Sequence, residues 1–483
     1  MTALVLTQRI TSTRWGTSAL TVGAGAVLGF LVGGGGDLGA MIAVLPLALC
    51  IFLVPPIAVC IAAATAPWVA RLVTTTGIAP RLIDFIDFPL VVAALISALV
   101  ARQAVRLPRA QVDVLRAIAA FAGAITISWA LNPSSPIRLI AGLLLIMQPL
   151  LLVAAIMIAP PTREWRRTAL WSFGLIMAAQ VPVALVQNSQ TSDPDNVKGT
   201  LFDANAGHHV MAGGAMLAAF VIAACITDRR LVVAGVTTAI ALGVMADGKQ
   251  VFFAAPIGLI VLVLFAGRGS RRSGSNGAAG AIFVLVACVV GLVGFGATDS
   301  LESFIENTRE TRGGKIALTE AMISDLTEDP LQGTFGFGPG STVSRFGYLS
   351  SVLITEGNPI EALGIGPGAR TVEYDELTAG SGFIGESSFS SGQSSLLGVL
   401  GDFGFLGALT FAAVVLALMR ALWQVSDPLA GAAAAGWAML LPLGFIFDWL
   451  EQPPFTLSLA LLTGLALTAV HEERAHDEAV STS

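Results

Sequence analysis

The stretch IRLIAGLLLIMQPLLLVAAIMI, residues 137–158, decides the class of fold. After Arg138 it carries no charged residue over a length close to the roughly 20 apolar residues that a helix needs to cross a bilayer. The rest of the chain has the same character, since 55% of its 483 residues are hydrophobic, 12% are charged and the mean hydropathy is +0.79. These values exclude a soluble globular protein and predict an all-α polytopic membrane protein.

Similar apolar segments recur along the chain, and we expect about 12–14 transmembrane helices. Around Pro55 and Pro56 the pattern allows either one kinked span or a tight hairpin. Tryptophans near span ends, such as Trp68, Trp165, Trp423 and Trp449, are interpreted as interfacial anchors. The predicted spans are 16–34, 38–54, 57–73, 82–101, 113–131, 137–158, 168–188, 207–227, 231–246, 250–267, 278–296, 395–419, 429–446 and 453–470.

Arginines cluster in loops that alternate along this topology, and the positive-inside rule places such loops in the cytoplasm. Fourteen spans then put both termini in the cytoplasm. The chain divides into N-terminal transmembrane helices (1–296), an extracytoplasmic loop domain with short helices (297–394), and C-terminal transmembrane helices with a cytoplasmic tail (395–483). The arginine clusters are Arg102, Arg106 and Arg109; Arg163, Arg166 and Arg167; Arg229 and Arg230; and Arg268, Arg271 and Arg272. The outward loops are 132–136, 189–206, 246–249, 297–394 and 447–452.

The three lysines of the chain, Lys198, Lys249 and Lys315, all fall in segments predicted to face outward. The positive-inside bias disfavours cations there, so they are either solvated loop residues or ligands for a shared anion. An ammonium group binds phosphate as a compact point charge. We therefore predict that the three lysines converge on one outward cavity and bind a diphosphate.

The 297–394 segment is the one long region without a predicted span. Apolar residues after Lys315 are spaced as on a helix, which Pro330 ends. Two similar turns follow, GFGPG at 336–340 and GIGPG at 364–368, and such glycine turns allow backbone to approach a ligand closely. The acidic residues lack a ligand-like spacing with histidine, so no metal or other cofactor is expected.

The order of these pieces resembles the O-antigen ligase and polymerase superfamily of bacterial envelope glycosyltransferases. The matching motifs are KGTLFDAN at 198–205, DGKQ at 247–250, the run from Gly313 through the GFGPG turn, and SSGQSSLLGVLGDFGFLG at 390–407. The motifs are short, and the resemblance covers the architecture of residues 80–460. It implies diphosphate-binding roles for Lys198, Lys249 and Lys315, and Arg138, Arg312 and Arg345 are further candidate cations.

Two departures from the family pattern stand out. Lysines replace the usual arginines, which keeps the charge but loses two-pronged phosphate binding. Gln393 stands where ligases have histidine, and glutamine cannot take up a proton near neutral pH. Gln393, Glu386 and His208 are the candidate catalytic residues, with His209 and Asp203 as alternatives. Asp402 is interpreted as a structural residue that caps or orients the re-entering helix.

The resemblance implies a metal-independent, inverting transfer that polymerises or ligates oligosaccharides carried on a polyprenyl diphosphate. The reaction would take place on the outer face of the bacterial plasma membrane, with the glycan donor, a glycan or glycolipid acceptor and the bilayer as partners and no nucleic acid. Two other classes stay open: a polysaccharide or lipid transporter or flippase, and a non-catalytic assembly subunit. The sparse charge in the span centres favours surface chemistry over transport. Whether the enzyme is a polymerase or a ligase, and its sugars, do not follow from the sequence.

Overall fold

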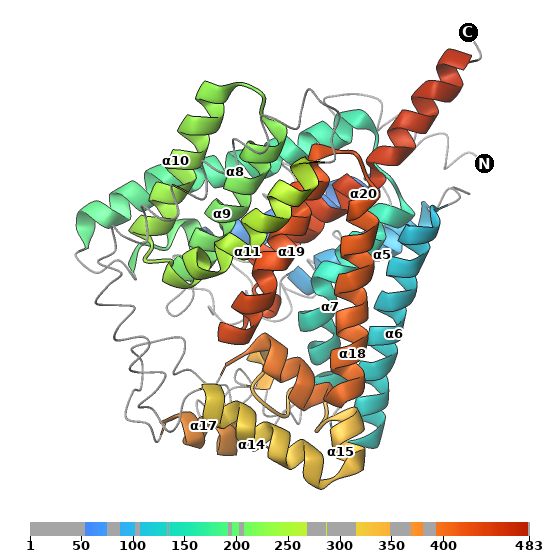
Figure 1. Ribbon diagram of the computed structural model, residues 1–483, viewed down its shortest axis with the longest axis vertical. Helices are drawn as coiled ribbons and strands as arrows, with labels where there is room; N and C mark the ends of the chain where they lie inside the picture. Colours follow the sequence, from blue (N-terminus) through green and yellow to red (C-terminus); the bar gives the residue numbers. More distant parts are fainter. Residues whose placement is uncertain are drawn as a thin grey trace.

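The computed structural model describes residues 54–74, 87–101, 107–132, 134, 136–191, 196–201, 207–267, 286, 315–347, 368, 370–379 and 393–481. These residues are mostly helical, and no strand occurs among them. Figure 1 shows the helices as one bundle with a smaller group of helices at its lower end. The elements are α4 (Pro56–Thr74), α5 (Asp87–Val100), α6 (Arg109–Leu131), α7 (Pro136–Ile158), α8 (Arg163–Gln190), η3 (Gly199–Leu201), α9 (Gly207–Cys225), α10 (Arg229–Met245), α11 (Lys249–Ala266), α14 (Lys315–Glu328), α15 (Pro330–Phe335), α17 (Thr371–Ala379), α18 (Ser395–Trp423), α19 (Pro428–Ile446), η5 (Trp449–Glu451) and α20 (Pro453–Ser481).

The predicted spans that fall among the described residues each coincide with a helix. Seven of these helices are long and apolar enough to cross a membrane, namely Arg109–Leu131, Arg138–Ile158, Arg163–Gln190, Gly207–Cys225, Lys249–Ala266, Ser395–Trp423 and Pro428–Ile446. Three shorter apolar stretches lie at Pro56–Trp68, Pro89–Val100 and Pro453–Ala469. Helix α4 begins at Pro56, and the spans predicted at 16–34, 38–54 and 278–296 lie almost wholly outside the described residues.

Helix α19 forms the centre of the bundle, where it contacts α9, α11, α18 and α20. Its N-terminus is fixed by Asp427, whose carboxylate accepts a hydrogen bond of 2.8 Å from the Leu429 backbone N–H. The helix is rich in alanine and glycine, and small side chains let helix backbones approach each other closely. A Cβ added at Gly258 of α11 would lie 2.8 Å from the Ala435 carbonyl oxygen, so this contact tolerates no side chain.

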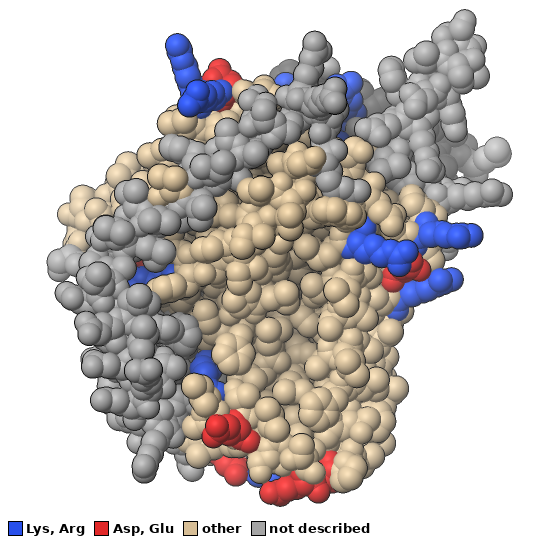
Figure 2. All heavy atoms as spheres, in the orientation of Figure 1, with Lys and Arg blue, Asp and Glu red and all other residues tan. Residues whose placement is uncertain are grey.

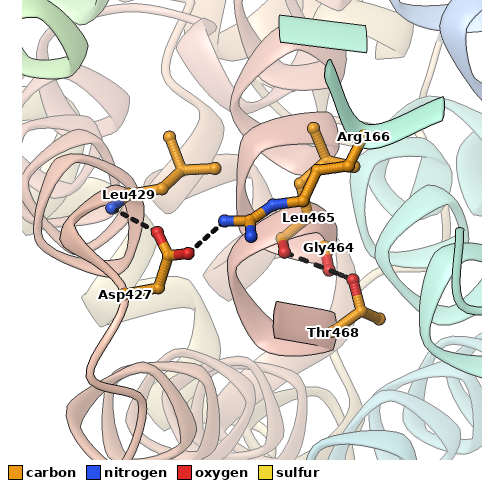
Figure 3. A network of polar contacts seen from close by, with 6 residues as sticks. All are labelled: Arg166, Asp427, Leu429, Gly464, Leu465 and Thr468. Atoms are coloured by element: carbon orange, nitrogen blue, oxygen red, sulfur yellow. Dashed lines mark hydrogen bonds and ion pairs between the residues drawn. The ribbon is translucent and has the colours of Figure 1, made fainter. Parts of the chain in front are cut away.

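At one end of the bundle, the starts of α6, α8 and α19 lie close to α20. At the first end, the Gln111 side chain donates a hydrogen bond of 2.7 Å to the Leu467 carbonyl. Figure 3 shows Arg166 of α8 meeting Asp427, the cap of α19, beside residues 464–468 of α20. These contacts bring together the starts of α6, α8 and α19.

The other end holds the short helices α14, α15 and α17, which Figure 1 shows opposite the C-terminal end of α20. There the Asn132 side chain donates to the Gly336 carbonyl at 2.9 Å, and the Ser395 N–H donates to the Phe447 carbonyl at 3.2 Å. Figure 2 shows a largely uncharged surface on this face, with the charged side chains of the described residues in small groups at its top, at its bottom and along its right and left edges.

A close backbone contact joins the GFGPG turn to a kink in α18. Gly404 has φ 67° inside the helix, and Gly336 has φ 75° in the turn. A Cβ on Gly336 would lie 2.4 Å from the Asp402 carbonyl carbon, and one on Gly404 would lie 2.5 Å from the Gly336 nitrogen. Both positions combine a left-handed backbone with no room for a side chain, so glycine is required at each.

The interpretation of Trp68 and Trp449 as interfacial anchors was wrong. Both side chains are fully buried. The Trp68 indole donates to the Ser458 hydroxyl at 2.9 Å, and the Trp449 indole donates to the Gln250 side chain at 3.2 Å. An indole can satisfy its N–H inside a protein as well as at a lipid surface. The position of a tryptophan near the end of a span therefore does not show whether its side chain lies at the lipid interface or in the protein interior.

Candidate functional site

The carboxylate of Asp402 organises the GFGPG turn. It accepts five hydrogen bonds, from the backbone N–H groups of Gly340, Ser341 and Thr342 and from the hydroxyls of Thr342 and Ser344, at 2.7–3.1 Å. Its backbone carbonyl also accepts from the Ser128 hydroxyl at 2.7 Å. Five donors leave this carboxylate no free lone pair, so Asp402 has a structural role, and its partner is the turn.

The loop between α19 and α20, residues 447–452, is buried throughout. Its backbone is joined to the start of α18, because the Leu450 N–H donates to the Ser395 hydroxyl at 2.9 Å. The loop places two carboxylates in the interior, Asp448 and Glu451, each only 2% exposed over the whole residue or less. Buried carboxylates of this kind are costly unless paired, and they are often functional.

Two cations from the 297–394 segment accompany these carboxylates. Arg345 lies with its guanidinium 3.3 Å from Asp448 Oδ2. The ammonium of Lys315, at the start of α14, donates to the Gln393 carbonyl and interacts electrostatically with Asp448. Lys315, Arg345, Asp448 and Glu451 are called here the buried ionic cluster. Both cations are less than one-tenth exposed, so the cluster lies buried where α14 and residues 336–347 meet the loop between α19 and α20.

Burial changes the proton affinity of two members of the cluster. It lowers the pKa of Lys315 to about 7, against an opposing effect of Asp448. It also raises the pKa of Glu451 well above its ordinary value, and the charges of Asp448 and Asp402 add to this effect, while Arg345 opposes it. With a pKa of about 7, Lys315 can exchange a proton near neutral pH.

Asp448 is held firmly within the cluster. Besides Arg345, it accepts a hydrogen bond of 2.7 Å from the Gln452 side chain. Glu451 differs, because neither of its carboxylate oxygens makes a hydrogen bond of normal geometry to any residue that the structure describes. The Arg345 guanidinium and backbone amide are the neighbouring groups that favour its ionised form.

A second set of polar residues continues from Trp449 towards α9. The Trp449 N–H can only donate, so the atom of Gln250 that faces it is the amide oxygen. The Gln250 nitrogen therefore donates to His209 Nε2 at 2.9 Å, which places the proton of the neutral imidazole on Nδ1. The His208 ring lies 3.8 Å from the His209 ring, centroid to centroid.

Of the remaining predicted residues, the structure describes Lys249, Lys198 and Arg138. Lys249 pairs with Asp247 at 2.8 Å and is partly exposed, and it interacts electrostatically with His209. Lys198 precedes η3, and its backbone N–H donates to the Gln187 side chain at 2.9 Å. Arg138 is buried and interacts electrostatically with Asp402. Arg312 and Glu386 lie outside the described residues, and the convergence of all three lysines stays a prediction.

Sequence reasoning identified Lys315 and Arg345 but missed Asp448 and Glu451. The 447–452 loop was predicted only as a short outward connection. The signal lay in the sequence FDWLEQPP, where two carboxylates three residues apart interrupt a long apolar region. Ionisable residues in such a setting are a reason to expect a functional site.

Comparison with models of known protein families, and with characterised proteins, finds no match to this chain.

Proposed function

We propose that this protein is a membrane glycosyltransferase that polymerises or ligates oligosaccharide units carried on a lipid diphosphate. The observation that carries the proposal is the buried ionic cluster at one end of an otherwise apolar helical bundle. An amphiphilic donor suits this layout, because its lipid tail can lie along the apolar helices while its charged head meets cations at the end. Cations there would stabilise the negative charge that develops on the departing diphosphate.

Lys198 and Lys249 supply further positive charge in the same proposal. Lys249 is well placed, because its side chain is 41% exposed and so can reach a ligand. Acceptor and donor would be held in line for inverting attack, with the lipid diphosphate as leaving group. No cofactor is part of this proposal.

Removal of the gene is expected to leave the lipid-diphosphate oligosaccharide unconsumed at the outer leaflet, and alanine at Lys198 or Lys249 should reproduce this partly. Each charge-assisted contact contributes on the order of 1.5–3 kcal/mol, so each single variant should cut turnover about ten- to a hundredfold. The measurement is the length distribution of surface glycan together with the amount of lipid-linked precursor. Arg230→Ala, an exposed cation at the opposite end of the bundle, is the matched control.

Two outcomes would contradict the proposal. If the precursor accumulates on the inner leaflet instead, the protein is a flippase. If the Lys198 and Lys249 variants make glycan of normal length, these lysines are solvated loop residues.

The proposed location is the bacterial plasma membrane, with α14 and α15 outside and the C-terminus in the cytoplasm. In a variant without native cysteines, a cysteine at Glu328 should react with an impermeant maleimide on intact cells, and one at Val480 should react only after lysis. Glu328 suits this test because it is exposed at the end of α14. The reverse labelling pattern would overturn the orientation.

A further inference from the structure

Of the three buried carboxylates described at this end of the bundle, Asp402, Asp448 and Glu451, the last has the fewest contacts. Asp402 accepts five hydrogen bonds, and Asp448 is held by Arg345 and Gln452. His209 is also committed, because its Nε2 lone pair accepts from Gln250. Glu451 is 2% exposed, and its one nearby donor is the backbone N–H of Arg345, while neither oxygen accepts a hydrogen bond of normal geometry from the described residues.

A buried acceptor in this state is energetically unfavourable on its own, and more so when it is charged. Such a group is stabilised when a ligand brings a donor to it. The cations Lys315 and Arg345 lie beside the same loop, so a ligand bound there would meet positive charge and a proton acceptor together. The hydroxyl of an acceptor sugar can donate a hydrogen bond. The diphosphate of the glycosyl donor beside it carries the negative charge.

We propose that Glu451 is the general base of the transfer and takes the proton of the acceptor hydroxyl. This inference rests on the proposed function and names the residue that performs one step of it. The acceptor oxygen forms a bond to the anomeric carbon, and the bond between that carbon and the diphosphate oxygen breaks. The diphosphate leaves with the bonding electron pair, and the hydroxyl proton moves to a Glu451 oxygen.

The charges around Glu451 fit this role. Asp448 at the start of its own loop and Asp402 of α18 raise its proton affinity, while Arg345 limits that effect. Lys315 of α14 faces Asp448, and Arg138 of α7 faces Asp402. A base works best when its pKa lies close to the operating pH, and a carboxyl with an ordinary pKa would be too weak. Because the base must be ionised, transfer should rise with pH through the pKa of Glu451.

The test uses the purified full-length chain in detergent and two probes. Inorganic diphosphate reports anion binding, and lipid-linked oligosaccharide extracted from cells lacking the gene reports transfer. Glu451→Gln keeps the shape of the side chain and should lower transfer about a hundred- to ten-thousand-fold, with diphosphate binding within about twofold of the wild type. The rise of the rate with pH should disappear in this variant.

Glu451→Asp provides a second test of the same proposal, which can be carried out even if the glutamine variant does not fold. It should retain part of the activity, and its rise with pH should shift, because the carboxyl is withdrawn by one methylene. Transfer by Glu451→Gln within about threefold of the wild type would overturn the inference, as would an aspartate variant with an unshifted pH profile. If the wild-type chain neither binds diphosphate nor consumes the lipid-linked glycan, the proposed function itself fails.

Discussion

Replacing Lys315 with alanine is expected to reduce glycan transfer by about ten- to a hundredfold, whereas Lys315→Arg should keep most of the activity. The ammonium of Lys315 donates to the Gln393 carbonyl and interacts with Asp448. Alanine would leave that carbonyl without its donor and would make the cluster more negative, which weakens the binding of a diphosphate. Arginine retains the positive charge and several donors.

The pH dependence of the transfer rate shows whether Lys315 acts through its positive charge or only through packing. Because the pKa of Lys315 is lowered to about 7, its charge is present below that pH and is lost as the pH rises through it. Wild-type transfer should therefore fall above about pH 7. In Lys315→Arg the cation stays charged, so the fall should disappear or move to a much higher pH.

The measurement is the initial rate of transfer from pH 5.5 to 9, with Glu328→Ala on the exposed face of the same helix as control. An alkaline fall that is unchanged in Lys315→Arg would mean that another group controls it. Equal loss of activity in the alanine and arginine variants would assign Lys315 to packing.

Replacing Asp402 with alanine is expected to destabilise the protein by about 3 kcal/mol or more. Hydrogen bonds to a charged group contribute about 1.5–3 kcal/mol each, although their loss is not additive. Asp402 accepts five of them, and its removal would leave the backbone N–H groups of Gly340 and Thr342 without an acceptor, while the Ser341 N–H would keep only the Gly338 carbonyl. Buried donors without partners are strongly unfavourable.

The isosteric variant Asp402→Asn sharpens this prediction. One oxygen would become an NH2 group, which would face hydroxyl or backbone donors instead of accepting from them. We therefore expect a loss of stability close to that of alanine. Thermal unfolding in detergent and proteolysis within 336–347 would measure it, with the exposed Asp113→Asn as control. A melting temperature of Asp402→Asn equal to that of the wild type would contradict the proposed role of the carboxylate.

The positions of the helices were predictable because the length of an uncharged apolar run sets them almost alone. The 137–158 and 429–446 segments are examples, and α7 and α19 match them within a residue or so. The arrangement of charge was less predictable. Lys315 and Arg345 were predicted as cations of an outward-facing segment. The sequence around each of them does not show that its side chain becomes buried.

Burial of those two cations depends on a contact between segments far apart in the chain. Arg345 meets Asp448, which is separated from it by 103 positions, and the loop of Asp448 packs on the start of α18. The pattern of a short loop between two spans does not say whether the loop points outward or folds inward. For the same reason Glu451 escaped notice, and Trp449 was assigned to the wrong environment.

The contact between Gly336 and Gly404 also bears on the order in which the chain is assembled. The first part of α18 contains Asp402, a charge that would be costly to bury alone in an apolar layer. The turn that donates hydrogen bonds to this carboxylate, residues 340–344, is synthesised some sixty positions earlier. During synthesis the donors are therefore already present when the carboxylate emerges. The bent half of α18 packs directly against that turn, so we expect the turn to be in position before this half of the helix reaches its final place.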